Sequence, residues 1–301
     1  MEQNFSIIGS NKSKNAVERC MNIVFLLCGL VAVVCVICMT VYMVISGWPA
    51  IQKIGIFKFL FGQVWNPENS QFGIAPMILS SIIATFSAIL IALPTGVFVA
   101  VFLAKLTPGK LSSALRMFID LLAGIPSVVY GLLGAILIVP LVFKLQTALG
   151  LPTSGSLLAA IIILIIMILP TIISVSETAI RAVPKQYEDA SLALGSTRLQ
   201  SIFKVTVPAA KSGIIAGMVL GVGRAIGEAM AVIMVAGNAA IMPEFLKPVR
   251  LLTASIPIEW AYSSGLHREA LYGIGLVLFV FIMIINIILN KVLKKGGDTS
   301  G

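Results

Sequence analysis

The sequence contains little charge. Asp, Glu, Lys and Arg make up 11% of the 301 residues, whereas soluble domains carry about 25%. Hydrophobic residues make up 58%, the mean hydropathy is +1.05, and no long polar block separates the apolar runs. The chain therefore has little room for a water-filled catalytic domain, and its composition is typical of a membrane protein.

Potential metal ligands are also scarce. His267 is the single histidine, and the four cysteines lie in or just before the first apolar run, at Cys20, Cys28, Cys35 and Cys38. The last two have C-x-x-C spacing, but no second pair or nearby histidine would complete a zinc site. We expect the cysteines to be small apolar residues that face lipid or neighbouring helices, and His267 to be a surface or packing residue.

A nucleotide-binding loop is missing as well. A P-loop needs the pattern G-x4-G-K-[ST], whose backbone N–H groups cradle phosphates. Gly109-Lys110 is followed by Leu111, and Lys211-Ser212 is preceded by Ala210, so neither fits. The chain is therefore predicted to bind no cofactor and not to be an enzyme, and any use of ATP would fall to a partner.

What the sequence does contain is a series of apolar runs long enough to cross a membrane. A hydrocarbon core of about 30 Å needs about 20 helical residues. Six runs qualify, at 22–45, 76–104, 114–140, 156–180, 213–238 and 271–290. They predict an all-α polytopic membrane protein with six transmembrane helices. The first run is too long for a signal peptide, and no small-x-small cleavage site follows it.

The basic residues indicate how these helices are oriented. The net charge is +9. If the N-terminus is cytoplasmic, the inner segments hold more than twice as many Lys and Arg residues as the outer ones, so both termini are predicted to be cytoplasmic. The tails are then 1–21 and 291–301, and the main extracellular segments are 46–75 and 239–270. Nucleic-acid binding is not expected, because the basic residues form no patch interleaved with aromatics.

The longest internal cytoplasmic connection, 181–212, has a pattern of its own. Two short amphipathic helical patches follow Pro184, and Gly195 separates them. Pro208 ends the pattern before the fifth span. A helix–Gly–helix segment with an exposed apolar face suits docking into a groove of another protein. The alternative is a helix that lies on the membrane surface.

Opposite charges occur at i,i+4 spacing in three spans, as Arg116/Asp120, Glu177/Arg181 and Arg224/Glu228. The first two pairs lie near cytoplasmic ends, where their side chains can reach headgroups or water, so we expect a structural role. Arg224 is about 20 Å from either end of its span, and a charge at that depth must face protein or water. On a helical projection, Arg224 and Glu228 share one stripe with Gly213, Gly217 and Gly221, which would let another helix approach closely.

Two interpretations of the Arg224/Glu228 pair remain open on the residues alone. The pair could be a buried ion pair that only fixes helix packing. It could instead border a translocation path, where the forked N–H donors of Arg224 attract a tetrahedral oxyanion and Glu228 keeps that attraction weak enough for release.

The connection 181–212 also carries a family resemblance. Asp189-Ala190-Ser191, three residues before Gly195, and Val205-x-Val207-Pro208 resemble the EAA-x3-G-x9-I-x-L-P loop of bacterial ABC importer permeases. The resemblance implies the type I importer permease fold, with a core over 76–290. It also implies that Asp189, Ala190 and Gly195 contact a separate ATP-binding subunit.

Longer stretches resemble the C-type permease of phosphate-specific ABC importers. They are NPENSQFGIAPMI (66–78), DLLAGIPSVVYGLLG (120–134), GVGRAIGEAMAVIMVAGN (221–238), LTASIPIEW (252–260) and SSGLHREAL (263–271). The resemblance implies a phosphate permease that forms a heterodimer with a second permease subunit, is driven by an ATP-binding dimer, and receives phosphate from an extracellular binding protein. It also implies that Arg224 and Glu228 serve phosphate passage.

Other functions stay open. A sulfate or molybdate permease, or the sister A-type permease of the phosphate importers, would share this architecture. A passive anion channel or an ion-coupled carrier would not need the 181–212 loop, and a membrane sensor would signal without transport.

Overall fold

The computed structural model describes residues 12–297, and these residues are mainly helical. The helices and strands follow one another as α1 (Lys12–Ile54), α2 (Ile56–Phe61), β1 (Trp65–Asn66), β2 (Gln71–Phe72), α3 (Ala75–Val101), α4 (Gly109–Gly124), α5 (Ser127–Leu133), α6 (Val139–Ala148), α7 (Leu157–Ala182), α8 (Lys185–Ala193), α9 (Arg198–Ser201), α10 (Val207–Ala209), α11 (Lys211–Gly227), α12 (Met230–Val235), α13 (Leu252–Glu259) and α14 (Gly265–Gly297). Single π-helical turns extend α3 at Phe102–Leu106, join α5 to α6 at Gly134–Ile138 and precede α10 at Ile202–Thr206. Short 3-10 turns occur at Pro67–Asn69 and Trp260–Tyr262.

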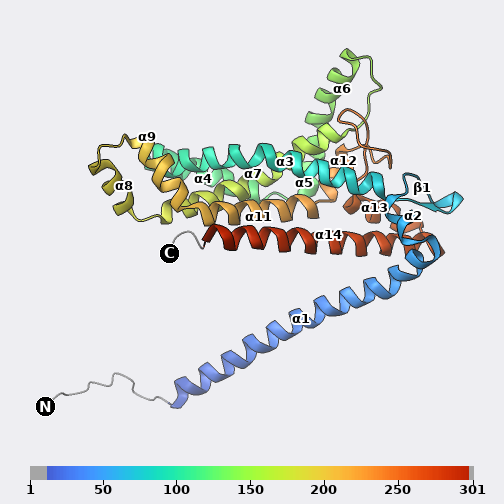
Figure 1. The fold of residues 1–301 in the computed structure, drawn as a ribbon, viewed down its shortest axis with the longest axis horizontal. Coiled ribbons are helices and arrows are strands. Elements are labelled where there is room, and N and C mark those ends of the chain that lie inside the picture. Colours follow the sequence, from blue (N-terminus) through green and yellow to red (C-terminus); the bar gives the residue numbers. More distant parts are fainter. Residues whose placement is uncertain (1–11, 298–301) are drawn as a thin grey trace.

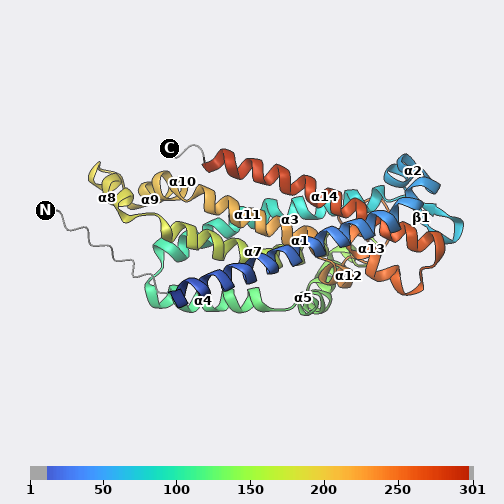
Figure 2. The ribbon, with the colours of Figure 1, turned by 90° about the horizontal axis from the view of Figure 1, so that it is seen from below.

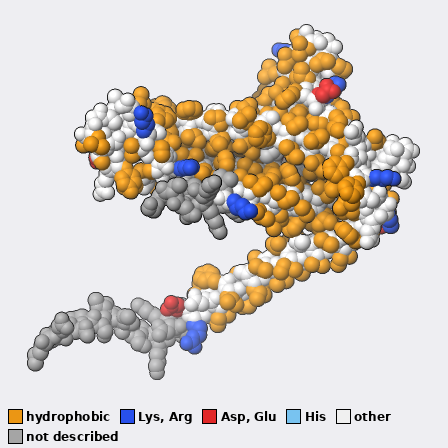
Figure 3. Space-filling model, in the orientation of Figure 1, with side chains coloured by type: hydrophobic (Ala, Val, Ile, Leu, Met, Phe, Trp, Pro, Cys, Tyr) orange, Lys and Arg blue, Asp and Glu red, His pale blue; other side chains and the backbone are white. Residues whose placement is uncertain are grey.

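Helices α3, α7, α11 and α14 run side by side as an elongated bundle, whereas α1 diverges from it toward its N-terminal end (Figures 1 and 2). One end carries α8 and α9, and the opposite end carries the antiparallel hairpin of β1 and β2; we call these the α8–α9 end and the hairpin end. Helix α1 begins, and α14 finishes, toward the α8–α9 end. Hydrophobic side chains cover most of the face seen in Figure 3, and the Lys and Arg side chains on it lie mainly toward the two ends.

The centre of the bundle is formed by α3, α7 and α11. Helix α3 turns a ridge of alanines toward α7, at Ala84, Ala88 and Ala92, and all three are fully buried. Their i,i+4 spacing puts them on one face, and small side chains there allow close backbone approach. At Gly96 on the same ridge, an added Cβ would lie 2.7 Å from Ile172 Cγ2, so the two helices are in contact there.

The number of membrane-crossing elements agrees with the expected fold. Within residues 12–297, five helices are long and apolar enough to span a membrane, at Glu18–Ile54, Ala75–Leu106, Ser127–Ala148, Leu157–Ala182 and Gly265–Leu289. The number is six if Arg198–Ala209 and Lys211–Gly227, a pair bent by 66° at Ala210, form one span. Pro208 therefore does not end the helical pattern; it lies in the first turn of α10, where its missing N–H costs little.

The third predicted span, 114–140, is wrong as a single helix. Helix α4 ends at Gly124, and Ile125 is extended, with φ −68° and ψ 130°. Pro126 disfavours a helical conformation in the residue before it, so the chain turns before α5 begins. The membrane-crossing stretch here is Ser127–Ala148, and Figure 1 shows α6 projecting from the bundle.

Candidate functional site

The fifth predicted span, 213–238, breaks near its middle. Helix α11 ends at Gly227, and Glu228 is extended, with φ −76° and ψ 125°. A short helix, α12, follows from Met230. Side-chain and tertiary hydrogen bonds hold this break: Glu228 Oε1 accepts from the Ala231 backbone N–H at 2.9 Å, and its backbone carbonyl accepts from Thr253 Oγ1 at 2.7 Å.

Glu228 is therefore a buried cap and not the partner of Arg224. Its exposed fraction is 8%, and no ion pair joins it to Arg224 within residues 12–297. The sequence interpretation of a helical i,i+4 pair is wrong at this point. Because of the break, Arg224 lies in the last turn of α11 and Glu228 precedes the first turn of α12, and the helix dipoles favour a positive charge at the former and a negative charge at the latter.

Arg224 reaches across to α7. Its Nη1 donates to Thr171 Oγ1 at 3.1 Å, and both residues are partly exposed. In the described part of the chain, Arg224 has no carboxylate partner, so most of its guanidinium donors remain free for another acceptor. Arg224 therefore presents a partly exposed guanidinium at a break in a membrane-spanning segment, and transporters commonly bind charged cargo at such discontinuous helices.

The three glycines of the predicted stripe lie against α7. An added Cβ at Gly213 would come within 2.3 Å of Ala179 Cβ, and one at Gly221 within 3.0 Å of Ile172 Cγ1. At Gly217 the nearest atom would be Ser176 Oγ, at 3.3 Å. The stripe therefore marks the surface along which α11 and α7 meet, and Arg224 contacts the same helix.

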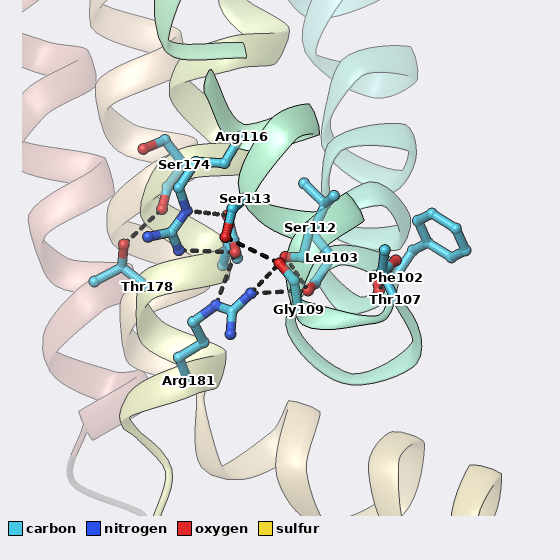
Figure 4. Close-up of polar contacts among 11 residues, drawn as sticks. Phe102, Leu103, Thr107, Gly109, Ser112, Ser113, Arg116, Ser174, Thr178 and Arg181 are labelled. Atoms are coloured by element: carbon cyan, nitrogen blue, oxygen red, sulfur yellow. Dashed lines mark hydrogen bonds and ion pairs between the residues drawn. The ribbon is translucent and has the colours of Figure 1, made fainter. Parts of the chain in front are cut away.

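The other two predicted charge pairs form one cluster. Glu177 on α7 is buried, with 2% of its side chain exposed, and it pairs with Arg116 on α4 at 2.7 Å and with Arg181 at 2.8 Å. Arg181 Nη2 also donates to Ser112 Oγ and to the Leu103 carbonyl (Figure 4). Arg116 thus pairs across helices with Glu177 rather than with Asp120.

A cavity of about 600 Å³ lies beside this cluster and is lined by Arg116, Arg181 and Asp120, among other residues. Both of its arginines form ion pairs with Glu177, and Asp120 supplies a further negative charge. The cluster joins α4 to α7, and it offers an anion less free positive charge than Arg224 does.

The 181–212 connection forms the two short helices that its sequence predicts, α8 and α9. Gly195 lies between them with φ +89°, a left-handed conformation that glycine adopts without strain. The turn is held by a 2.7 Å hydrogen bond between Ser191 Oγ and Ser196 Oγ. Asp189, Ala190 and Gly195 are all exposed at the end of the bundle, so a partner could reach them.

A second polar cluster occupies the hairpin end. The Glu259 carboxylate, 6% exposed, accepts from Trp65 Nε1 at 2.9 Å and pairs with Arg250 and with His267 Nε2, the latter at 2.7 Å. His267, with 14% of its side chain exposed, is therefore a packing residue, one of the two roles expected from the sequence: it lies against Trp65 and Phe72 and pairs with a carboxylate. Burial raises the pKa of the nearby Tyr262 phenol, and the Glu259 charge raises it further, so this phenol stays protonated at neutral pH.

Sequence reasoning missed Thr171 and Glu188. A signal for Thr171 existed, because it is the sole polar side chain in the run LLAAIIILIIMILPTII (157–173). Glu188 gave no such signal, because its partner Lys105 is 83 residues away. No group of three or more His, Cys, Asp or Glu residues within 12–297 is arranged to hold a metal ion.

Comparison with known proteins assigns this architecture. The family model for the binding-protein-dependent transport system inner membrane component matches residues 92–295. The chain belongs to this family. It is the permease of an ABC importer, a multi-pass protein of the inner membrane, and not an enzyme. Such permeases work with ATP-binding and substrate-binding partners.

Individual relatives cover most of the permease. It is 34% identical to the probable ABC transporter permease protein YqgH of Bacillus subtilis (strain 168), over 95% of each chain. It is also 34% identical to the phosphate transport system permease protein PstC of Pasteurella multocida (strain Pm70), over 85% of this chain and 86% of that one.

Solved structures agree on the fold. A bacterial alginate ABC transporter in complex with an alginate pentasaccharide-bound periplasmic protein matches with a TM-score of 0.60 at 14% identity, over 95% of this chain and 96% of that chain. The MetNI methionine ABC transporter, in an inward-facing conformation, matches with a TM-score of 0.54 at 20% identity, over 74% and 94%. These likenesses bear on the type I importer permease fold alone.

Proposed function

We propose that this permease moves inorganic phosphate across the cytoplasmic membrane by alternating access, and that Arg224 borders the route. The observation that carries the proposal is the partly exposed guanidinium at the break between α11 and α12, which has the neutral Thr171 as its partner. The similarity to phosphate transport permeases over 85% of the chain supports phosphate as the cargo.

The chemistry of the break suits a transient anion site. Arginine presents several N–H donors in a fixed fork, and these match the oxygens of a tetrahedral anion. Glu228 is the first residue after α11, and its buried negative charge lowers the affinity for an anion near Arg224. Because conduction requires an ion to leave as well as to enter, this opposition favours turnover over tight binding.

The remaining surfaces fit the assembly of such an importer. In this proposal, the α8–α9 end faces the cytoplasm together with both termini, and Asp189, Ala190 and Gly195 contact an ATP-binding dimer. The channel is completed by a second, different permease subunit. The outer segments 46–75 and 239–270 meet an extracellular phosphate-binding protein, and the permease core occupies 76–290.

The test is ATP-dependent uptake of labelled phosphate by proteoliposomes that contain the complete complex. Arg224→Gln removes the charge at similar size and should abolish uptake while the complex stays assembled. Lys144→Gln, which removes an exposed positive charge on α6, tests whether uptake responds to loss of positive charge in general and should leave uptake unchanged. Normal uptake by Arg224→Gln would refute the role of this residue.

The nature of the cargo is tested in the same vesicles. Unlabelled phosphate should compete with labelled phosphate, whereas sulfate and molybdate at the same concentration should not. Competition by sulfate or molybdate alone would assign a different oxyanion. Uptake that continues without ATP would indicate a channel or an ion-coupled carrier instead.

A further inference from the structure

The side chain of Glu188 ties the α8–α9 connection to the end of α3. Its Oε2 pairs with Lys105 Nζ at 2.9 Å, and only 21% of the glutamate side chain and 14% of the lysine side chain are exposed. Lys105 lies in the π-helical turn that extends α3. The pair therefore joins two segments that are far apart in the sequence, and it is largely shielded from water and salt.

Glu188 also contacts the segment that leads into α11. Its Oε1 accepts from Thr206 Oγ1 at 3.3 Å, and Thr206 is fully buried. Its backbone carbonyl accepts from Ser201 Oγ at 3.5 Å. A second link runs back to α3, because Arg198 Nη2 donates to the Lys105 carbonyl at 3.0 Å. One residue thus connects α8 to α3 and to the start of the fifth span.

The opposite surface of α8 is open. Gln186, Ala190 and Ala193, which lie away from Glu188 on a helical projection, are exposed, and Leu194, just after the helix, is 90% exposed. Helix α8 therefore has an inner contact, through Glu188, and an outer surface without a partner in the described chain. A force applied to the outer surface would reach α3 through the Glu188 side chain.

We propose that Glu188 is a positioning residue that transmits movement of α8 to α3 and α11, with the Lys105–Glu188 ion pair as the transmitting contact. This inference rests on the proposed function, in which α8 and α9 contact the ATP-binding subunit. Helices α3 and α11 both pack on α7, and α11 carries Arg224, so movement delivered at Lys105 and Thr206 acts directly on the helices around the proposed route.

The experiment uses the complete importer in proteoliposomes and measures phosphate uptake and ATP hydrolysis in parallel. Glu188→Gln keeps the size of the side chain and removes its charge. We expect the number of ATP molecules hydrolysed per phosphate imported to rise at least about fivefold, the lower end for coupling between distant sites. Charge exchange, with Lys105→Glu and Glu188→Lys in one chain, should lower that ratio again.

The control is Glu18→Gln, which makes the same chemical change at an exposed glutamate on α1. Glu18 lies outside α8 and outside the outer segments proposed to meet the binding protein, so this variant should leave the ratio unchanged. An unchanged ratio in Glu188→Gln, or a parallel loss of uptake and hydrolysis, would overturn the proposal, because Glu188 would then serve only to hold the loop. If Glu188→Gln does not assemble, a charge-exchanged complex that assembles and remains uncoupled would overturn it.

These outcomes differ from failure of the proposed function. That failure would appear as normal phosphate uptake in Arg224→Gln, or as no phosphate uptake by the unaltered complex, whatever the Glu188 variants do.

Discussion

Adding a methyl group to Gly213 tests the packing of α11 on α7 directly. In Gly213→Ala, the new Cβ would lie 2.3 Å from Ala179 Cβ. Carbon atoms in contact are normally about 3.5–4.0 Å apart, so the two helices must separate locally by more than about 1 Å. Ala179 Cβ is not the flexible end of a long side chain, and it can withdraw only if the backbone of α7 moves.

The size of the effect follows from two opposing terms. Overpacking of this kind typically costs about 1–3 kcal/mol. Replacing glycine by alanine inside a helix stabilises it by up to about 1 kcal/mol. Gly223→Ala, in the same helix, gains the helix stabilisation without the overpacking cost, because its Cβ would meet nothing within 4 Å. The difference between the two variants therefore isolates the packing cost, about 1–3 kcal/mol.

Thermal denaturation of the detergent-solubilised permease, followed by circular dichroism, measures this difference. Gly213→Ala should unfold several degrees below Gly223→Ala. Gly217→Ala should fall between them, because its Cβ would lie 3.3 Å from its nearest neighbour. Equal stability of Gly213→Ala and Gly223→Ala would show that α11 does not pack on α7 through this stripe.

Three further substitutions test other contacts. Thr171→Val removes the hydroxyl beside Arg224 and should raise the phosphate concentration for half-maximal uptake about tenfold. Thr178→Val, whose hydroxyl bonds to its own helix, should leave this concentration unchanged. Equal values for the two variants would show that Thr171 does not contribute to the phosphate route. Glu177→Gln should lower the stability of the permease by up to about 3 kcal/mol in denaturation assays, because two arginines lose a buried carboxylate, although their exposure reduces the cost. Trp65→Phe removes one hydrogen-bond donor from buried Glu259 and should lower the stability of the permease by about 1–2 kcal/mol. Limited digestion should then cut residues 62–74 faster. An unchanged rate would show that the Trp65–Glu259 hydrogen bond does not anchor this segment.

The apolar runs predict most of the fold because span length and helix geometry fix where the chain can cross a membrane. The same runs conceal the breaks. The segment around Gly227 and Glu228 looks continuous in hydropathy, and its interruption depends on Thr253, a partner 25 residues away. The break at Ile125–Pro126 did carry a local signal, since a residue before proline avoids the helical conformation.

The candidate site shows the same division. Arg224 could be singled out because one charge at that depth requires a partner or water. That its partner would be Thr171, and that Glu228 would cap α12, depends on contacts between helices, which no spacing rule within one helix supplies. Glu188 is the clearest example, because its neighbour Asp189 carries the family pattern while Glu188 makes the inward contacts with Lys105 and Thr206.

The contact between α1 and α14 has a consequence for biosynthesis. The two helices meet through Tyr42 and Tyr272, whose hydroxyls are 2.9 Å apart, and through Gly47, whose added Cβ would touch the Gly273 backbone. The ribosome makes α1 before α14, so α1 must remain in the bilayer without this partner until α14 has been synthesised. Its apolar surface, exposed along nearly the whole span, suits contact with lipid during that interval, because a helix satisfies its own backbone hydrogen bonds.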